Sequence, residues 1–304
     1  MSAEFITLSN AFAAATEKAA RFTGAVHTEA RGSSSGVIWR PGVIVVAEHT
    51  LRRDAEIQVT LPDARVVLAT LVGRDPSTDL AVLKCQEAPA STLPLGDAST
   101  LKAGNLALVV GRTRASGPVA ALGFVSLVIN ERRMWGGTKF APYVRLDVAL
   151  QPTAIGGAVV DAHENVVGIA TPRFARFGAI AIPAATVNRV VDALLEKGRI
   201  SRGYLGVGVQ PVRLPDQLRQ KLARTEKAAA MVLEVEPEGP AHKAGVVIGD
   251  ILVSLGGRVV TRLEDVQEHL YGENIGKSVE AKFVRGGELR ETNIIVGERK
   301  TGGE

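Results

Sequence analysis

The spacing of apolar residues changes along the chain. In residues 3–22 the spacing is helical, with apolar side chains at Phe5, Leu8, Phe12, Ala15 and Ala19, so we expect a helix there. Residues 24–183 instead contain short apolar runs rich in valine and isoleucine, most of them bounded by Gly, Pro, Asp or Asn. Such runs are typical of β-strands, and many short strands without helices between them favour barrels or a sandwich.

A second helix marks the boundary of a further domain. Residues 185–195 carry an apolar stripe of valine and leucine side chains, and Gly198 is suited to end that helix. After it, short strands and short helices alternate. We therefore expect an N-terminal segment at 1–23, a β domain at 24–198 and a smaller α+β domain at 199–304.

Composition and charge exclude several classes of protein. Hydrophobic residues make up 46% of the 304 positions and charged residues 22%, as in soluble globular proteins. The net charge is only +4, and the basic residues are scattered among acidic ones, so we expect no nucleic-acid partner. No apolar stretch is long enough to span a membrane, and the N-terminus lacks the basic start and apolar core of a signal peptide. The sequence as given therefore indicates the cytoplasm, whereas a leader already removed would indicate the periplasm.

Cysteine and histidine spacing indicates neither disulfide nor metal chemistry. Cys85 is the single cysteine, which excludes an intrachain disulfide. It ends an apolar run, so we expect a small residue at a strand end rather than a reactive thiol. His27, His163, His242 and His269 show no zinc-like spacing, and we expect no metal and no cofactor.

Ordered segments across most of the chain carry a resemblance to a known family. The segments are Ser35–Ile38, Val45–Leu51, Val72–Lys84, Leu95–Ser99, Pro142–Asp147, Gln151–Asp161, Arg202–Val207 and Gly239–Leu252. In this order and spacing, over residues 30–298, the chain resembles the HtrA/Deg serine proteases. The resemblance implies a mainly β fold, in which a trypsin-like double six-stranded β-barrel is followed by a smaller α+β PDZ domain.

The resemblance also assigns the places of a catalytic triad. His49 takes the place of the histidine that accepts the nucleophile's proton, and Asp79 that of the carboxylate that orients it. Where the family reads Asn-Pro-Gly-Asn-Ser-Gly-Gly, residues 151–157 read Gln-Pro-Thr-Ala-Ile-Gly-Gly. Ile155 thus stands at the nucleophile position, and isoleucine has neither a proton to give nor a lone pair for attack. Loss of a triad nucleophile typically costs about a million-fold in turnover.

Two further departures precede Ile155. Thr153 and Ala154 replace Gly-Asn in the loop whose backbone N–H groups form the oxyanion hole. Because the β-branched Thr153 would be strained in the backbone conformation that glycine permits, we expect a remodelled oxyanion loop. Three departures in one loop favour natural divergence over a single engineered substitution.

Alternatives stay open for the first domain. An active protease would need another nucleophile, and neither Thr153 nor the serines at 33–35 have a motif reason to meet His49. Without a nucleophile, His49 and Asp79 form a hydrogen-bonded pair that holds the cleft together, the interpretation we favour. The specificity pocket is expected to differ from that of the family. Its expected residues are Asp147, Thr171–Phe174 and the loop Arg112–Pro118.

The second domain is the better candidate for a binding function. PDZ domains add an extended peptide as a strand to a sheet edge. The resemblance implies that the loop Tyr204–Val207 receives the peptide carboxylate, that Gly206 permits close approach and that Arg202 adds charge attraction. The side chains expected to line a pocket for the last apolar residue of the peptide are Leu205, Val207, Val266 and Leu270. The alternative is that these are ordinary core residues.

Three hypotheses for function follow. The first is a catalytically inactive homologue that binds C-terminal or unfolded peptides as a chaperone, adaptor or scaffold. The second is a weakly or conditionally active serine endopeptidase in protein quality control. The third is a regulatory subunit that joins an active homologous protease. The resemblance further implies a homo-oligomer, a trimer, in which Phe5, Phe12 and Phe22 of the N-terminal helix pack across the interface; alternatively that helix lies on its own barrel.

Overall fold

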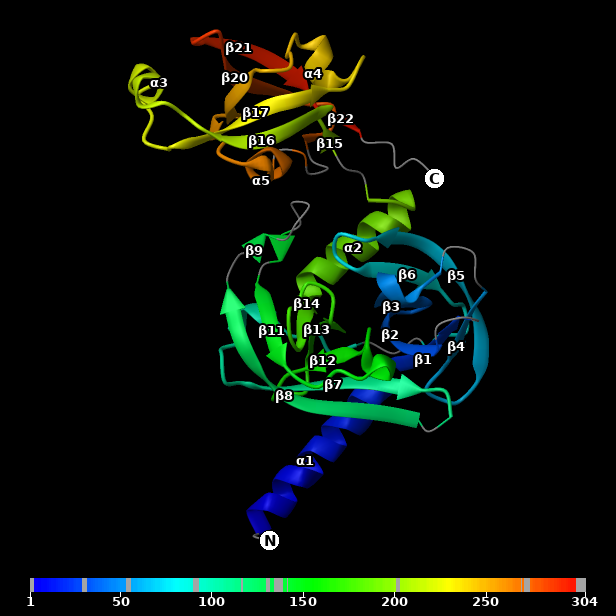
Figure 1. Ribbon diagram of the computed structural model, residues 1–304. Coiled ribbons are helices and arrows are strands. Elements are labelled where there is room, and N and C mark those ends of the chain that lie inside the picture. The colour runs from blue at the N-terminus through cyan, green and yellow to red at the C-terminus, as the bar shows by residue number, and fades with distance from the viewer. Residues whose placement is uncertain are drawn as a thin grey trace. The chain divides into compact units, whose positions relative to one another are not determined.

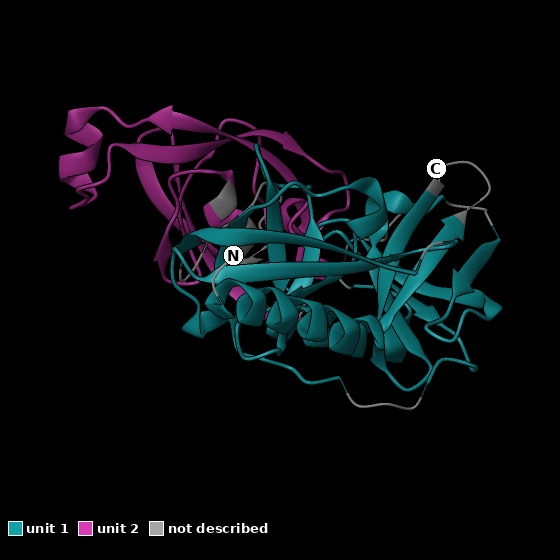
Figure 2. Ribbon diagram, turned by 90° about the horizontal axis from the view of Figure 1, so that it is seen from below, with its two compact units in different colours: residues 1–134, 138–200 teal, residues 135–137, 201–304 magenta. Residues whose placement is uncertain are grey.

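Two compact units make up the chain (Figure 2). The described residues of positions 1–200 form unit 1, and those of positions 201–304 form unit 2. The computed structural model describes residues 3–28, 32–52, 56–89, 93–115, 117–129, 132–133, 139–140, 142–200, 203–268, 270 and 274–298.

Unit 1 contains two closed, antiparallel, six-stranded barrels (Figure 1). The first has the strand order β1-β2-β3-β6-β5-β4 and the second the order β11-β14-β13-β12-β7-β8. The strands of the first are β1 (Thr23–Thr28), β2 (Gly32–Arg40), β3 (Val43–Ala47), β4 (Ile57–Thr60), β5 (Val66–Asp75) and β6 (Leu80–Lys84). Those of the second are β7 (Leu106–Thr113), β8 (Gly117–Ile129), β11 (Tyr143–Asp147), β12 (Ala158–Val160), β13 (Val166–Thr171) and β14 (Ala179–Pro183). This architecture confirms the predicted double six-stranded barrel.

Short elements and two helices complete unit 1. They are α1 (Ala3–Ala20), α2 (Ala184–Lys197), the two-stranded pair β9 (Arg132–Arg133) and β10 (Lys139–Phe140), and the 3-10 turns η1 (Glu48–Thr50), η2 (Ala98–Thr100) and η3 (Pro152–Ala154). Helix α2 ends as its sequence predicts. Gly198 has a φ of 68° and donates its N–H to the Leu194 carbonyl at 2.8 Å, which is the left-handed cap that glycine favours.

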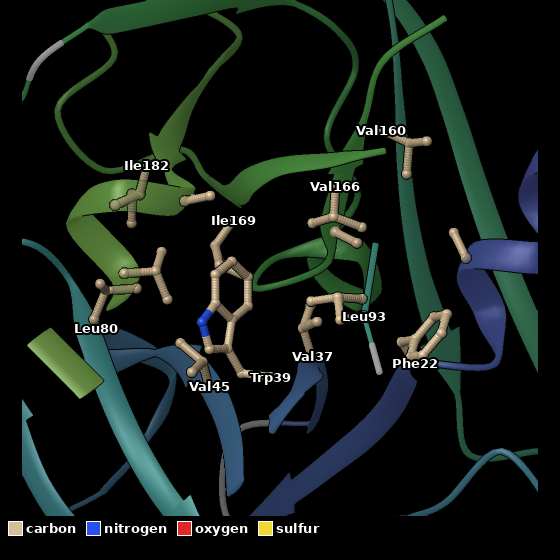
Figure 3. Packing of buried hydrophobic residues seen from close by; sticks show 14 of the residues in the cluster. Phe22, Val37, Trp39, Val45, Leu80, Leu93, Val160, Val166, Ile169 and Ile182 are labelled. Carbon is tan, nitrogen blue, oxygen red and sulfur yellow. The ribbon is translucent and has the colours of Figure 1, made fainter. Parts of the chain in front are cut away.

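The largest apolar core draws residues from both barrels and from both helices. Trp39 of the first barrel is 3% exposed and lies among Val45, Leu80 and Ile169 (Figure 3). Its indole N–H donates to Asn188 Oδ1 of α2 at 2.8 Å, so the buried polar group of the ring is satisfied. Each barrel also has its own apolar interior. The shared core therefore fixes the position of one barrel against the other.

Unit 2 is built on one antiparallel sheet. Its strand order is β16-β17-β18-β20-β21, so that β16 and β21 are the edges, and β19 pairs with β18. The strands are β15 (Gly203–Tyr204), β16 (Val207–Arg213), β17 (Ala228–Val235), β18 (Ile251–Leu255), β19 (Arg258–Val259), β20 (Ser278–Arg285), β21 (Glu288–Ile295) and β22 (Gly297–Glu298). The helices are α3 (Asp216–Lys221), α4 (Pro240–Lys243) and α5 (Leu263–Glu268). The mixture of strands and short helices confirms the predicted α+β class.

Helix α1 is buried along only part of its length. Ala15 and Ala19 belong to the shared core, whereas Phe5 is 65% and Leu8 48% exposed. In Figure 1 the N-terminal half of the helix projects away from the barrels. The helical spacing of the sequence therefore predicts the helix, but only its second half packs on a barrel. No helix among the described residues is both long and apolar enough to cross a membrane.

Arg112 anchors the buried end of α1. Its Nε donates to the Thr23 carbonyl at 2.7 Å and its Nη2 to the Ala20 carbonyl at 3.0 Å. The side chain is buried, and this burial lowers the pKa of the guanidinium. Arg112 was expected in a loop at the specificity pocket, but it lies in strand β7 and contacts the helix end instead.

We expect Arg112→Leu to destabilise the chain by about 1–3 kcal/mol, because two buried carbonyls each lose a charged donor. Urea denaturation followed by tryptophan fluorescence measures the change. Arg114→Leu is the matched control: Arg114 is exposed, so its replacement should change the free energy of unfolding by less than about 0.5 kcal/mol. Equal effects of the two substitutions would contradict the anchoring role.

Candidate functional site

His49 and Asp79 form a close hydrogen-bonded pair. His49 Nδ1 lies 2.8 Å from Asp79 Oδ2 and 2.9 Å from Oδ1, and the His49 backbone N–H donates to Oδ1 at 3.0 Å. The Asp79 side chain is fully buried, whereas that of His49 is 27% exposed. In a catalytic triad, a carboxylate hydrogen-bonded to Nδ1 orients the imidazole ring so that Nε2 can accept the proton of the nucleophile and later donate it. The structure thus brings together the two residues that the sequence assigns to the triad.

A tight turn between β5 and β6 aims Asp79. The buried Asp75 carboxylate accepts from the Ser77 hydroxyl at 2.6 Å and from the Thr78 hydroxyl at 2.8 Å. Asp79 follows with a φ of 59°, a left-handed conformation that aspartate tolerates better than most residues. Its carbonyl accepts the Glu48 N–H at 3.0 Å. Backbone and side chain of Asp79 therefore both hold the η1 turn that carries His49.

Thr171 is the third partner of Asp79, and it comes from the other barrel. Its hydroxyl donates to Asp79 Oδ2 at 2.5 Å. Thr171 was expected to shape the specificity pocket, but its side chain is fully buried against the carboxylate. Two residues further on, Arg173 Nη1 lies 3.9 Å from Asp79 Oδ1 and 3.6 Å from Glu48 Oε2. Strand β13 and the residues after it thus supply both a donor and a positive charge to the pair.

The segment before Ile155 is a closed 3-10 turn. In η3 the Ala154 N–H donates to the Gln151 carbonyl at 2.9 Å, and the Ile155 N–H donates to the Pro152 carbonyl at 3.2 Å. Neither Thr153 nor Ala154 has a positive φ. An oxyanion hole needs N–H groups aimed at the substrate, whereas the Ile155 N–H is directed into the turn.

Gly156 places this turn beside the His49–Asp79 pair. Its N–H donates to the Ala170 carbonyl at 2.8 Å, next to Thr171. A Cβ on Gly156 would collide with the Ser35 carbonyl oxygen and would lie 3.1 Å from the nitrogen of Ala47, which leads into η1. With a φ of 80° as well, the position requires glycine. Gly156 therefore lies against the segments that lead to Thr171 and to His49, and the assignment of Ile155 to the nucleophile position stays a prediction of the resemblance.

Ser35 is a residue of this site whose role the sequence did not indicate. Its hydroxyl donates to the Thr153 carbonyl at 2.6 Å and accepts the Arg112 N–H at 2.8 Å, while its own N–H donates to the Ile155 carbonyl at 2.8 Å. Ser35 thus holds the middle of the η3 turn and the residue that follows it. The contact with Thr153 spans 118 residues and that with Arg112 spans 77, so no local sequence pattern indicates them.

Cys85 has the structural role that its position indicates. It follows β6, is 2% exposed, and belongs to the interior of the first barrel. Burial raises the pKa of its thiol, so the thiolate needed for reactivity is disfavoured at neutral pH.

In unit 2 the described residues expected for peptide binding lie around the start of the edge strand β16, and their apolar side chains lie in or against the core of the unit. Gly206 has a φ of 75°, and the carbonyls of Leu205 and Gly206 accept the N–H groups of Ala241 and Glu236, both at 2.8 Å. Tyr204 lies in β15 and Val207 begins β16. The residues that share one apolar cluster are Leu205, Val207, Val266 and Leu270. Arg202 lies outside the described residues.

Comparison with known proteins defines the class of each part. The sequence model of the trypsin-like peptidase domain matches residues 34–169, and that of the PDZ domain matches residues 203–296. The described protein is thus a trypsin-like domain followed by a PDZ domain.

Similar proteins narrow this class to a family. A probable periplasmic serine endoprotease DegP-like from Halomonas elongata is 32% identical over 279 residues, which are 90% of this chain and 58% of the relative. A protein of the same description from Bartonella henselae is 33% identical over 84% of this chain and 50% of its own length. The solved structure of the HtrA-type protease AlgW with a decapeptide is 26% identical, with a TM-score of 0.80 over 96% of this chain and 99% of that one. The serine endoprotease from Yersinia pestis gives a TM-score of 0.77 at 25% identity over 95% and 98% of the two chains.

The chain belongs to the HtrA/Deg family of serine endoproteases with a C-terminal PDZ domain. It spans 58% and 57% of the length of the first two DegP-like relatives. The order and spacing of the segments in the sequence predict this family correctly.

We expect Ser35→Ala to loosen the η3 turn. It removes the donor to Thr153 and an acceptor for Arg112, which should lower the free energy of unfolding by about 1–2 kcal/mol and speed hydrogen exchange of the amides of residues 154–157. Ser33→Ala is the matched control in the same strand, since the Ser33 hydroxyl is buried without a hydrogen-bond partner. Unchanged exchange at 154–157 in Ser35→Ala would show that this serine does not hold the turn.

Proposed function

We propose that this chain is a catalytically inactive HtrA/Deg homologue that binds peptides through its PDZ domain. The observation that carries the proposal is a combination of two features. In unit 1, position 155 near the His49–Asp79 pair holds a hydrocarbon side chain, and in unit 2 the strand β16 is an open edge of the sheet. A hydrolase needs a nucleophile at position 155, whereas peptide addition needs only unpaired backbone groups.

Two independent features oppose proteolysis. Ile155 has no atom that can attack a carbonyl. In addition, the Ile155 N–H is bonded to Pro152 within η3, so the amide is not aimed at a developing oxyanion. Since one missing oxyanion donor typically costs about a hundredfold to a thousandfold in rate, restoring a hydroxyl alone would still leave a deficit of that size.

A weakly or conditionally active endopeptidase is the alternative function. The intact contacts among His49, Asp79 and Thr171 favour it, and the relatives are named as proteases. The same contacts also have a structural purpose, because they join the two barrels through a buried carboxylate. We favour the structural role, since no residue described near His49 supplies the missing nucleophile by a known motif.

Peptide binding is supported by the geometry at the start of β16. Gly206 has a positive φ, and Leu205 and Val207 belong to the same apolar cluster as Val266 of α5. The similar protease AlgW has been solved with a decapeptide. We propose that a peptide binds here with its carboxylate at the loop Tyr204–Val207 and its last apolar side chain in the cluster. The activity fits an adaptor, a scaffold or a chaperone for C-terminal or unfolded peptides.

Assembly and compartment complete the proposal. The exposed Phe5, Ile6 and Leu8 on the projecting half of α1 give this helix an apolar surface of the kind that partner subunits cover. We propose a homo-oligomer, a trimer by family resemblance, and keep a mixed oligomer with an active homologous protease as its variant. The relatives are named as periplasmic, which favours the periplasmic alternative for this chain.

Reversion of the η3 segment tests the loss of catalysis. A fluorophosphonate probe and casein should show no labelling and no hydrolysis with the natural chain. We expect Ile155→Ser alone to remain at least about a hundredfold below the triple variant Thr153→Gly, Ala154→Asn, Ile155→Ser, because only the latter frees the loop. His49→Ala in the triple variant should abolish the recovered activity. Labelling of the natural chain that disappears on His49→Ala would refute the pseudoprotease proposal.

The proposed peptide site is tested by asking whether binding requires the free C-terminal carboxylate of the peptide. Peptides with an apolar last residue and a free C-terminus should bind, whereas the same peptides with an amidated C-terminus should lose about tenfold or more in affinity, because charge-assisted bonds to the loop contribute about 1.5–3 kcal/mol. Gly206→Val should weaken binding similarly, since valine is strained at a φ of 75°. Fluorescence polarisation measures both. Equal affinity for acid and amide would contradict recognition by the loop Tyr204–Val207.

A further inference from the structure

The backbone N–H and carbonyl groups of successive residues in β16 point alternately toward β17 and toward the open edge, and the hydrogen bonds at both ends of the strand show which residues face which side. The Gly206 carbonyl accepts the Glu236 N–H at 2.8 Å, and the Leu214 N–H donates to the Lys227 carbonyl at 2.9 Å. These two residues, one before and one after the strand, both direct their backbone toward β17. Because backbone groups alternate in direction along a strand, the even-numbered residues 208, 210 and 212 face β17. The odd-numbered residues face away from it.

The bulge in this pair of strands does not break the alternation. Gly208 pairs with Glu234 and Val209 with Val232, so the extra residue, Leu233, lies on β17. Strand β16 therefore continues without an insertion, and its edge-facing residues are Val207, Val209, Pro211 and Arg213.

Pro211 interrupts this row of edge-facing groups. It lies opposite Ala230 in the register of β16 and β17, and as proline it has no N–H to donate. Proline is found in sheets where its nitrogen faces an open edge, which agrees with the assignment of Pro211 to the edge-facing residues of β16. Val207 and Val209 each present an N–H and a carbonyl at this edge, whereas Pro211 presents a carbonyl and a ring where the hydrogen would be.

We propose that Pro211 limits recognition by this PDZ domain to about the last four residues of a bound peptide. The inference rests on the proposed peptide site. A peptide whose last residue (position 0) lies opposite Val207 and which runs antiparallel to β16 has position −2 opposite Val209 and position −4 opposite Pro211. Position −2 exchanges two hydrogen bonds with Val209. The carbonyl at position −4 finds no donor and meets the proline ring, so the added strand separates from β16 there.

The ligand class that follows is a short C-terminal motif rather than a long extended segment. Residues beyond position −3 contribute little to affinity, so the domain accepts many proteins that share a C-terminal end. A free carboxylate and an apolar last side chain carry the selectivity.

Peptide length and Pro211 are tested together on the full chain. The probes are two free-acid peptides with unmodified N-termini, Ser-Leu-Ser-Val and Ala-Ser-Ala-Ser-Leu-Ser-Val, so that only the longer one has a carbonyl at position −4; dissociation constants come from NMR titration. In the natural chain we expect the heptapeptide to bind within about twofold of the tetrapeptide. In Pro211→Ala the heptapeptide should gain roughly threefold to tenfold, the effect of one added hydrogen bond, while the tetrapeptide is unchanged. Pro215→Ala is the control, since Pro215 is exposed and precedes α3, outside β16.

A second readout is the new backbone amide at position 211 of the Pro211→Ala variant. It should become protected from hydrogen exchange when the heptapeptide binds and stay unprotected with the tetrapeptide. A clear advantage of the heptapeptide in the natural chain, or no gain for it in Pro211→Ala, would overturn the inference while leaving peptide binding intact. Absence of binding by both peptides in the natural chain and in Pro211→Ala would overturn the proposed peptide site and the inference with it.

Discussion

A charge removed from water must be hydrogen-bonded by its surroundings, and in unit 1 that requirement falls on Asp79. Its fully buried carboxylate accepts from the backbone and ring of His49 and from the hydroxyl of Thr171. His49 belongs to the first barrel and Thr171 to the second, so satisfying one carboxylate sets the position of one barrel against the other. The shared core around Trp39 fills the rest of the boundary. The pair therefore has a structural reason to persist: its loss would leave a buried polar group without partners, whatever the chemistry of the cleft.

The η3 turn is the second place where the barrels meet, and there the constraint is close backbone approach. A Cβ on Gly111 would lie 2.5 Å from the Ser35 hydroxyl and 2.9 Å from both the Thr153 carbonyl oxygen and Ala154 Cα. Gly156 is as tightly enclosed on the other side. Ser35 links the two by bonding to Thr153 and Ile155. The backbone around position 155 is therefore held by its neighbours, and the side chain at this position can change without a change in the course of the chain.

The sequence predicted most of what local pattern can encode. Helical spacing and Gly198 indicated the course of α2, the strand pattern indicated the barrels, and the motif segments indicated His49 and Asp79. What it missed depends on contacts between distant residues. Ser35 is one of three consecutive serines in the sequence, and only the fold shows that it holds η3. The resemblance placed Thr171 and Arg112 in segments expected to shape the specificity pocket, but one satisfies a buried carboxylate and the other a helix end. A side chain's direction is decided by which buried groups need a partner, and that is known only once the barrels are closed.

The two candidate functions of this chain differ in how much local chemistry they need. Proteolysis depends on one hydroxyl and on amide groups aimed to within a fraction of an ångström, so under the proposed function the side chain at position 155 and the closed η3 turn are together enough to remove it. Peptide addition depends on an edge strand, a glycine with positive φ and an apolar cluster, all of which unit 2 builds from its own residues. Because each unit has its own core, the sequence of η3 can diverge without altering β16. The physical independence of the two sites would allow a protease fold to lose its reaction and keep a peptide-binding function, as we propose for this chain.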